Sequence, residues 1–277
     1  ILDASITNEI TLSAWVNISN SNSLMSVLRY YPDNLYNPEN NAPNMQYSMC
    51  INNGKIYFIA GAGNVEVNQF EQGTANIGTT PISLDQWHYV TITYDKQYIK
   101  FYVDGILDFE RSIVASFDSK NGGDLIIGGD ISNLWNFDGK ISDVEIWNKP
   151  LSQDEISFYM SCSPIGDEDG LIGYWDLNEG SGNTVYDISG NGNHGINNES
   201  TYSDDVPEHN CELYTDTETI EEELDNYSLS FDGVDDWVEA PPIDLTGNEF
   251  TIEGWIKLPQ VTHFDQTNII DNYVFGS

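Results

Sequence analysis

The sequence predicts an all-β protein whose strands form a sandwich or a barrel, and three observations support this prediction. Aromatic residues make up 12% of the 277 residues, with 16 Tyr and 7 Trp, and these residues favour the pleated, half-buried surface of a sheet. Several short segments alternate apolar and polar residues with the period of a strand. Gly, Asn and Asp divide these segments at the spacing that is typical of antiparallel β folds.

The predicted strands begin with residues 10–18, where apolar and polar residues alternate from Ile10 to Ala14. Two apolar runs, 46–51 and 55–60, flank Asn52-Asn53-Gly54, and this pattern predicts a hairpin. The other predicted strands cover residues 87–94, 98–103, 124–128, 140–147, 171–175, 227–231 and 237–240.

A single short helix is predicted near residues 151–160. Ser152 and Glu155 have the spacing of a capping box, in which each side chain binds the backbone of the other residue. Leu151 and Ile156, with Tyr159 or Met160, give the helix an apolar side. Because so short a helix is not stable alone, we expect it to pack on the sandwich.

An internal repeat suggests the domain organisation. The segment 8–18 matches 248–258, with four of eleven positions identical. The sequence therefore predicts a first module at 1–162 that lacks its leading strands, a polar linker at 163–169, and the N-terminal part of a second module at 170–277. We expect the strands of 171–175 and 227–240 to dock on the first module, although a separate half-sandwich is the alternative. The highly acidic stretch 197–226 is predicted to be a solvated loop.

Four groups of segments resemble the laminin G-like, concanavalin A-like jelly-roll modules of bacterial surface proteins. They are residues 170–182 with 186–195, residues 229–239 with 250–256, residues 87–94 with 99–105, and residues 137–147 with 151–156. The resemblance implies two facing antiparallel sheets in a jelly roll, present here as two truncated tandem copies. It also implies a secreted or cell-surface setting, within a larger adhesin or polysaccharide-degrading protein.

The net charge of −36 limits the classes of partner. A chain with 45 acidic and 9 basic residues repels phosphate backbones, so we expect no binding to nucleic acid. No apolar run is long enough to cross a bilayer, so we expect no membrane insertion. The acidic residues serve solubility or, alternatively, some of them hold Ca²⁺, which prefers oxygen ligands.

The three cysteines divide into a pair and a single residue. Cys162 and Cys211 lie in turn-rich polar segments, and we expect them to form a disulfide. Cys50 lies in an apolar strand pattern, which favours a buried free thiol.

Aromatic residues in loops are the candidate ligand contacts. Trp135 lies between two predicted strands, and Tyr30, Tyr31 and Tyr36 lie in a Pro- and Asn-rich segment that we interpret as a loop. Loop aromatics are better placed to contact a sugar than aromatics inside strands. The strand residues Trp15, Trp87, Trp147 and Trp255 are expected to be core residues.

Two turns contain candidate Ca²⁺ ligands. Asp187, Asn191 and Asn193 alternate in a Gly-rich loop, a spacing that resembles oxygen ligation of calcium, although Asx-turn chemistry explains the same residues without a metal. The second turn is acidic, and its candidate ligands are Asp232, Asp235 and Asp236. A simple hairpin at Asp232-Gly233 is the alternative explanation of this turn.

No catalytic motif is evident. Glucanases of this fold use paired acids on one strand, but the nearest candidate, Asp143-Val144-Glu145, lacks a third acid. We therefore expect a non-catalytic binding or adhesion module directed at a glycan or a cell surface. A structural spacer and a glycoside hydrolase or lyase are the alternatives.

Overall fold

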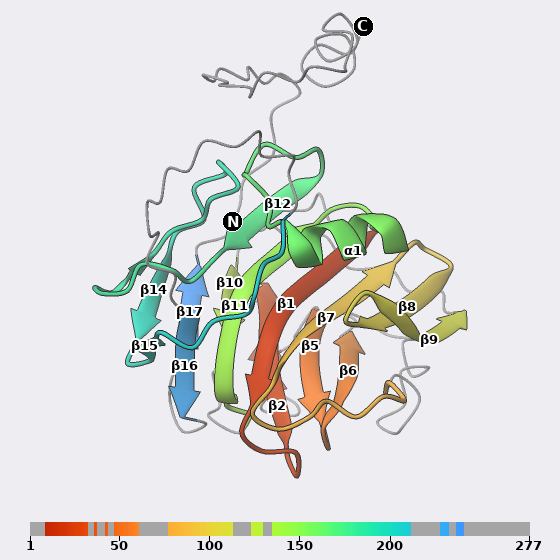
Figure 1. The fold of residues 1–277 in the computed structure, drawn as a ribbon, viewed down its shortest axis with the longest axis horizontal. Helices are drawn as coiled ribbons and strands as arrows, with labels where there is room; N and C mark the ends of the chain where they lie inside the picture. Colours follow the sequence, from red (N-terminus) through yellow and green to blue (C-terminus); the bar gives the residue numbers. More distant parts are fainter. Residues whose placement is uncertain are drawn as a thin grey trace, which may run out of the picture. The chain divides into compact units, whose positions relative to one another are not determined.

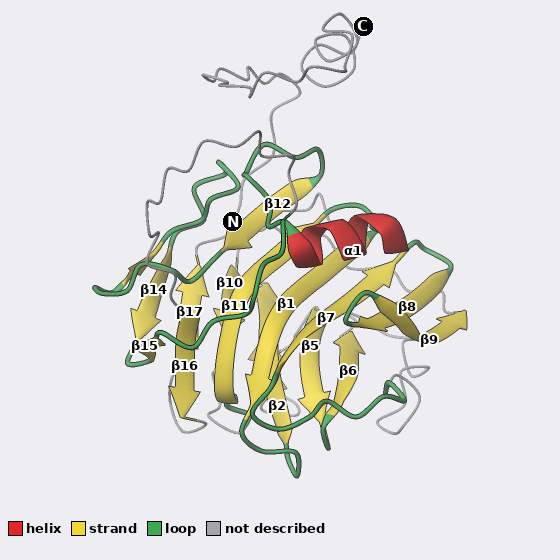
Figure 2. Ribbon diagram, in the orientation of Figure 1, coloured by secondary structure: helices red, strands yellow, loops and turns green. Residues whose placement is uncertain are grey.

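The computed structural model describes residues 9–32, 36–37, 42–43, 47–60, 77–112, 123–129, 135–211, 228–232 and 237–240. These residues form two antiparallel sheets that face each other, sheet A with eight strands and sheet B with seven. One helix lies on the outer side of sheet A (Figure 1, Figure 2). The predicted jelly-roll β-sandwich with one short helix is therefore confirmed.

The chain divides into two compact units, residues 1–210 with 225–245 and residues 211–224 with 246–277. All described strands and the helix belong to the first unit. Of the second unit, the structure describes Cys211.

Sheet A has eight strands, and all of its pairs are antiparallel. The path across the sheet is β15 (Thr201–Ser203), β16 (Ser228–Asp232), β11 (Asp138–Trp147), β1 (Ile10–Ile18), β7 (Trp87–Tyr94), β8 (Tyr98–Val103) and β9 (Ile106–Ser112). Strand β12 (Leu171–Trp175) pairs with the C-terminal half of β11, while β16 pairs with its N-terminal half.

Sheet B has seven strands. Their order is β13 (Thr184–Val185), β14 (Gly195–Asn198), β17 (Trp237–Ala240), β10 (Gly123–Ile127), β2 (Leu24–Pro32), β5 (Tyr47–Asn52) and β6 (Lys55–Ala60). A separate two-stranded sheet joins β3 (Tyr36–Asn37) to β4 (Ala42–Pro43).

Strands from beyond residue 170 complete both sheets. Strands β12 and β16 pair with β11, and β17 pairs with β10, so the docking prediction is confirmed. This pairing supplies hydrogen-bond partners to strand edges that would otherwise be exposed. The division into modules at 1–162 and 170–277, separated by a linker, stays a prediction, because residues 241–277 lie outside the described part of the chain.

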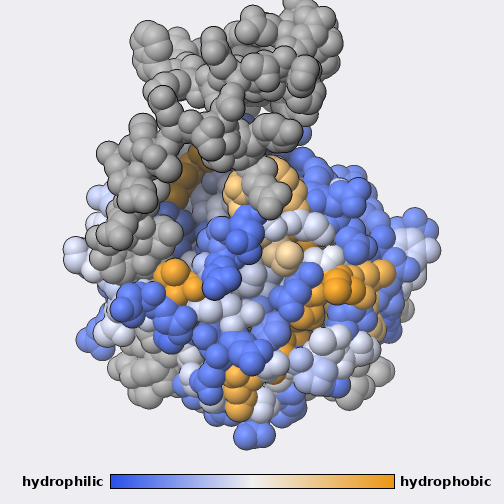
Figure 3. Space-filling model, in the orientation of Figure 1, coloured by the Kyte–Doolittle hydropathy of each residue, from blue (hydrophilic) through white to orange (hydrophobic). Residues whose placement is uncertain are grey.

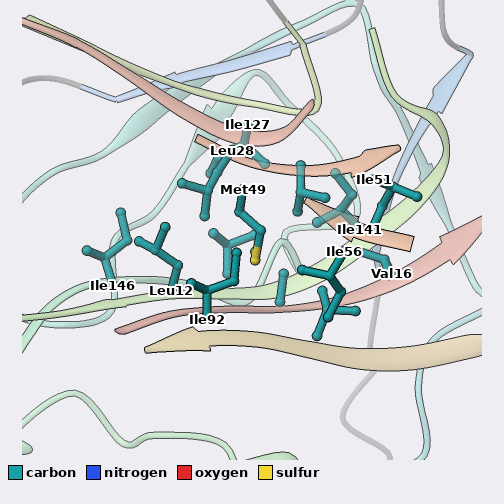
Figure 4. Packing of buried hydrophobic residues seen from close by; sticks show 14 of the residues in the cluster. Leu12, Val16, Leu28, Met49, Ile51, Ile56, Ile92, Ile127, Ile141 and Ile146 are labelled. Atoms are coloured by element: carbon teal, nitrogen blue, oxygen red, sulfur yellow. The ribbon is translucent and has the colours of Figure 1, made fainter. Parts of the chain in front are cut away.

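The core lies between the two sheets. Every second residue from Ile10 to Ile18 is apolar and belongs to this core, as expected of a strand with one face on the core. The polar residues between them, such as Thr11 and Ser13, are buried as well, on the outer side of sheet A. Burial of each large aliphatic side chain stabilises the fold by about 1.5–3 kcal/mol. Figure 4 shows side chains of the two sheets pointing toward one another, among them Leu12, Ile92 and Ile146 from sheet A and Leu28, Met49 and Ile127 from sheet B.

The predicted helix and hairpin are both confirmed. Helix α1 (Gln153–Ser161) begins with a complete capping box, since Ser152 Oγ accepts a bond from Glu155 N and Glu155 Oε2 accepts one from Ser152 N. The helix buries Ile156 in a second cluster on the outer face of sheet A, which includes Trp147. Strands β5 and β6 are joined at Asn53 (φ 50°) and Gly54 (φ 72°), two positive values that a tight hairpin turn requires.

Two predictions need correction. Residues 197–203 are not a solvated loop, because they contain the end of β14 and all of β15. Strand β14 pairs with β17, and β15 pairs with β16, so strands form here despite the polar sequence. Full burial is confirmed for Trp147 but is wrong for Trp15 and Trp87, which are half-buried because they lie on the outer side of sheet A. Residues 204–211 contain no helix or strand, as predicted for a loop. Residues 212–226 of the acidic segment and Trp255 lie outside the described residues.

The cysteine predictions are confirmed. Cys162 and Cys211 are disulfide-bonded, and Cys50 is a buried free thiol. Among the described residues, no helix has the length and apolar character needed to span a membrane.

Candidate functional site

The outer face of sheet B presents one continuous row of residues. Register fixes this row, because directly paired residues of an antiparallel sheet point to the same side. Ile196 of β14 pairs with Glu239, which pairs with Ile126; Ile126 pairs with Arg29, which pairs with Ser48 of β5. Core residues flank Ile126, Arg29 and Ser48 along their strands, so these three side chains lie on the outer side of sheet B, although each is at most 2% exposed.

Arg29 is the only cationic residue among the buried side chains of the described residues, and only 2% of its surface is exposed. Its Nε donates a hydrogen bond to Ser48 Oγ at 3.2 Å, and its Nη2 contacts Cys50 Sγ at 3.7 Å. Ser48 Oγ donates in turn to Leu28 O at 3.0 Å. A guanidinium buried in this way is held in one orientation by β2 and β5.

Trp135 covers Arg29. The Arg29 Cζ atom lies 3.9 Å from the centroid of the indole ring, a close cation–π contact. Ser26 N donates to Trp135 O at 2.7 Å, which anchors the Trp135 backbone to β2. Trp135 lies in the connection between β10 and β11, as predicted, and it remains half-buried. Its indole is therefore fixed on one side by Arg29 and partly open to solvent.

Unpaired polar atoms lie beside Trp135. Among the described residues, Ser26 Oγ and both side-chain amide atoms of Asn136 are buried without a hydrogen-bond partner. Leaving such groups unpaired costs about 1–3 kcal/mol each. These atoms are buried in the unbound protein, and a hydroxyl-rich ligand that reached them would supply both donors and acceptors.

The other predicted ligand contacts fall in different environments. The placement of Tyr30 in a loop is wrong, because it lies in β2, is 2% exposed and stacks on Tyr47 in the core. A bulge in β2 between Ser26 and Leu28 sets which side chains face inward. Tyr31 also lies in β2, paired with Asp124, and Tyr36 lies in β3. The side chains of Tyr31 and Tyr36 lie outside the described residues.

Asp187 is a buried hydrogen-bond hub. Its Oδ1 accepts bonds from Tyr174 N, Ser189 N and Ser189 Oγ, and its Oδ2 accepts bonds from Asn193 N and Asn193 Nδ2. The Nδ2 of Asn191 donates to Leu171 O.

Five donors occupy both carboxylate oxygens of Asp187, so this turn does not fit Ca²⁺ as it is folded here. Asx-turn hydrogen bonding accounts for its residues. No metal-binding group of three or more His, Cys, Asp or Glu side chains is found in the described part of the chain. Asp235 and Asp236, and the side chain of Asp232, lie outside the described residues, and Ca²⁺ at that turn stays a prediction.

The acids of β11 are buried on the outer side of sheet A. Glu145 is fully buried, and its two oxygens accept bonds from Tyr89 Oη at 2.9 Å and Trp147 Nε1 at 3.0 Å. Burial is the main cause that raises the pKa of Glu145 to about 8; the charge of Asp143 acts in the same direction, and the hydrogen bonds from Trp147 and Tyr89 oppose the shift.

Asp143 lies in a left-handed conformation (φ 49°), at the point where β11 changes its partner from β16 to β12. Its oxygens accept bonds from Tyr174 Oη at 2.8 Å and Ser142 Oγ at 2.8 Å. His209 Nε2 lies 3.3 Å from the same carboxylate, and this hydrogen bond raises the pKa of His209 although burial opposes it.

This arrangement differs from an open pair of catalytic carboxylates. Tyrosine, tryptophan, serine and histidine side chains occupy the oxygens of both acids, and each acid is at most 5% exposed. Glycoside hydrolysis requires two carboxyl groups that reach opposite faces of a bound sugar.

Figure 3 shows the face of the molecule on the side of sheet A, which is largely hydrophilic with separate small apolar areas.

Sequence reasoning missed Arg29. The signal was present, since a single cation stands within the apolar strand 24–32. A buried arginine in such a strand needs partners that compensate its desolvation, and one of them, Trp135, is more than 100 positions away in sequence.

Comparison with protein families gives one match. The family model described as the concanavalin A-like lectin/glucanases superfamily matches residues 2–157, which is more than half of the chain. None of the curated proteins that were compared with the chain matches it.

Solved structures share the fold at low identity. A Bacteroides ovatus protein whose description proposes carbohydrate binding is 18% identical with a TM-score of 0.48, and the match covers 66% of this chain and 50% of that one. The chain thus spans half the length of the Bacteroides protein. A heptameric pentraxin of Limulus polyphemus is 16% identical with a TM-score of 0.43, covering 61% and 81% of the two chains. The CBM40 domain of a Ruminococcus gnavus sialidase, bound to α2,3-sialyllactose, is 13% identical with a TM-score of 0.41, covering 55% and 83%. Because these TM-scores are below 0.5, no ligand is carried over from them.

Proposed function

The chain belongs to the concanavalin A-like lectin/glucanase superfamily, and we propose that it is a non-catalytic module that binds carbohydrate at the outer face of sheet B. The observation that carries the proposal is the stack of Arg29 and Trp135 beside the unpaired polar atoms of Ser26 and Asn136. An aromatic ring offers a flat apolar surface to the C–H face of a sugar, and adjacent polar atoms bind its hydroxyl groups.

Preorganisation supports this location. Arg29 is fixed by Ser48 and Cys50, and the Trp135 backbone is fixed by Ser26. Because the indole is already ordered, little conformational entropy is lost when a ligand stacks on it. A stacking residue on a mobile loop would lose part of its binding energy to ordering.

The buried acids support a non-catalytic role. In the described structure, Glu145 and Asp143 are bonded to Tyr89, Trp147 and Tyr174 and do not line an open cleft. Glu145 is protonated at neutral pH, because its pKa is raised to about 8. A protonated, enclosed carboxyl group bonded to core side chains is suited to stabilising the outer face of sheet A.

Charge narrows the class of glycan. The net charge of −36 repels polyanionic polysaccharides, so we propose a neutral glycan as the ligand. The repulsion weakens at high ionic strength because salt screens it.

The proposed setting is extracellular, as part of a larger secreted or cell-surface protein that adheres to a glycan-bearing surface. The Cys162–Cys211 disulfide supports this setting, since disulfides persist in oxidising compartments.

Binding to a glycan array tests the proposal. We expect the wild-type protein to bind neutral glycans, Trp135→Ala to lose this binding, and Trp87→Ala to retain it. Trp87 is a matched control because it is also half-buried but lies in sheet A. A purely structural spacer would bind no glycan at all, and equal loss in both variants would place the site elsewhere.

A further inference from the structure

We propose that the ribbon of β13 and β14 carries a second sugar subsite, built on Tyr186, His194 and Ile196, so that the ligand is an extended polysaccharide chain rather than one terminal sugar. This inference rests on the proposed function and deepens it. The subsite lies outside residues 2–157, the part of the chain that matches the family model.

The subsite and Trp135 share one face of sheet B. Val185 is fully buried in the core, and its neighbour Tyr186 is 54% exposed, so Tyr186 points outward. Ile196, also 54% exposed, pairs with Thr184 on the same side. The row from Ile196 then continues by register through β17 and β10 to Arg29, beneath Trp135. Ile126 and Arg29 are each 2% exposed, so the exposed described side chains of this face lie at its two ends, around Tyr186 and at Trp135.

Tyr186 is exposed but firmly held. Its backbone N donates to Glu179 Oε1 at 2.7 Å, and the next residue is the buried hub Asp187. Its ring contacts the imidazole of His194 edge to face, with centroids 5.3 Å apart and an interplanar angle of 73°. A large apolar ring that is ordered and yet half in solvent is suited to stacking on a ligand.

His194 adds a hydrogen-bond donor to this subsite. Asp187 N donates to His194 Nδ1 at 3.0 Å, so in the neutral imidazole the proton is on Nε2. Within the described residues, Nε2 makes no hydrogen bond, and the side chain is exposed. It is therefore free to donate to a sugar hydroxyl next to the Tyr186 ring.

The separation of the two subsites determines the length of the ligand. Four inter-strand spacings separate β13 from β2, which corresponds to about 19 Å across the sheet. One aromatic ring covers one sugar ring, so a single sugar cannot reach both. A chain of several linked sugars that crosses the strands engages Tyr186 and Trp135 together, and the two contacts reinforce each other.

Affinity electrophoresis in gels that contain xylan, galactomannan or hydroxyethyl cellulose tests the inference, followed by calorimetry with oligosaccharides of increasing length from the polysaccharide that retards the wild type. We expect Tyr186→Ala to weaken binding of the longest oligosaccharide about tenfold while leaving the shortest ligand unaffected. Tyr186→Phe keeps the ring and should bind like the wild type. Phe158→Ala, at a 52% exposed position on α1, is the matched control.

The outcomes separate this inference from the proposed function. If Trp135→Ala weakens binding at every length while Tyr186→Ala changes none, the second subsite is wrong and the proposed function stands. If none of the three polysaccharides retards the wild type, both are overturned.

Discussion

Arg29 lies beneath the indole of Trp135, with its Cζ atom 3.9 Å from the ring centroid. This contact joins β2 to the connection between β10 and β11, two segments that are far apart in sequence. It places the single buried cation of the described chain directly behind the aromatic ring proposed to bind sugar. Because the same contact supports both the fold and the site, changes at Arg29 should affect stability and binding together.

Arg29→Lys should lower the free energy of unfolding by about 2–3 kcal/mol. Lysine keeps the charge but lacks the planar guanidinium that stacks on Trp135 and bonds to Ser48. Urea unfolding measures the change. The reverse exchange, Lys100→Arg, changes a partly exposed residue paired with Glu110, and it should alter stability by less than about 0.5 kcal/mol. Equal effects of the two exchanges would contradict the role given to Arg29.

Glu145→Gln should change how stability depends on pH. Burial raises the pKa of Glu145 from its ordinary value of 4.5 to about 8, so the folded state binds its proton more tightly than the unfolded state. The stabilisation of the folded state by protonated Glu145 is therefore complete below pH 4.5, and it is lost as the pH rises toward 8. The wild type should therefore lose stability relative to Glu145→Gln between pH 5 and 8, as measured by denaturant unfolding at several pH values. A constant difference across this range would show that Glu145 is ionised in the folded protein.

Asp143→Asn should lower the pKa of His209. The hydrogen bond to Asp143 is the main cause of the raised pKa of His209, and asparagine removes the charge while tolerating the left-handed backbone at this position. Since the pKa is raised in the folded state, the pair stabilises the fold at pH values below the ordinary 6.5 and loses this effect as the pH rises through the folded pKa. An NMR titration of the His209 ring measures the shift. His194, which is not bonded to Asp143, is the internal control, and an unchanged His209 titration would rule out the pair.

Replacing both Cys162 and Cys211 with Ser should lower the free energy of unfolding by about 2–4 kcal/mol, because the disulfide restricts the unfolded chain. A reducing agent should lower the melting temperature of the wild type and leave the double variant unchanged. A melting temperature of the wild type that does not respond to reduction would contradict a stabilising role for this disulfide.

Local pattern was sufficient to predict much of the fold. The bounds of β7, β8, β12 and β17 agree with prediction. Turn residues in the sequence mark ends of three of them, namely Asp95 after β7, Asp104-Gly105 after β8 and Gly170 before β12. The helix α1 and its capping box were likewise encoded by residues close in sequence.

The remaining features depend on distant contacts. Strands β14 and β15 have polar sequences and exist because β17 and β16 supply backbone partners. The bulge in β2 and the burial of Tyr30 follow from packing between the sheets, which no short segment reveals. Arg29 and Trp135 meet only when β2 lies beside β10, so the candidate site was predicted at Trp135 but not at its supporting cation.

Hydrogen–deuterium exchange with and without a bound neutral oligosaccharide tests the central claim most directly. We expect the ligand to slow exchange in β2, β5 and the Trp135–Asn136 segment on the outer side of sheet B, and also in the ribbon of β13 and β14. Protection confined to β1, β7 and β11, around Trp15, Asp143 and Glu145, would place the sugar on sheet A and contradict the account.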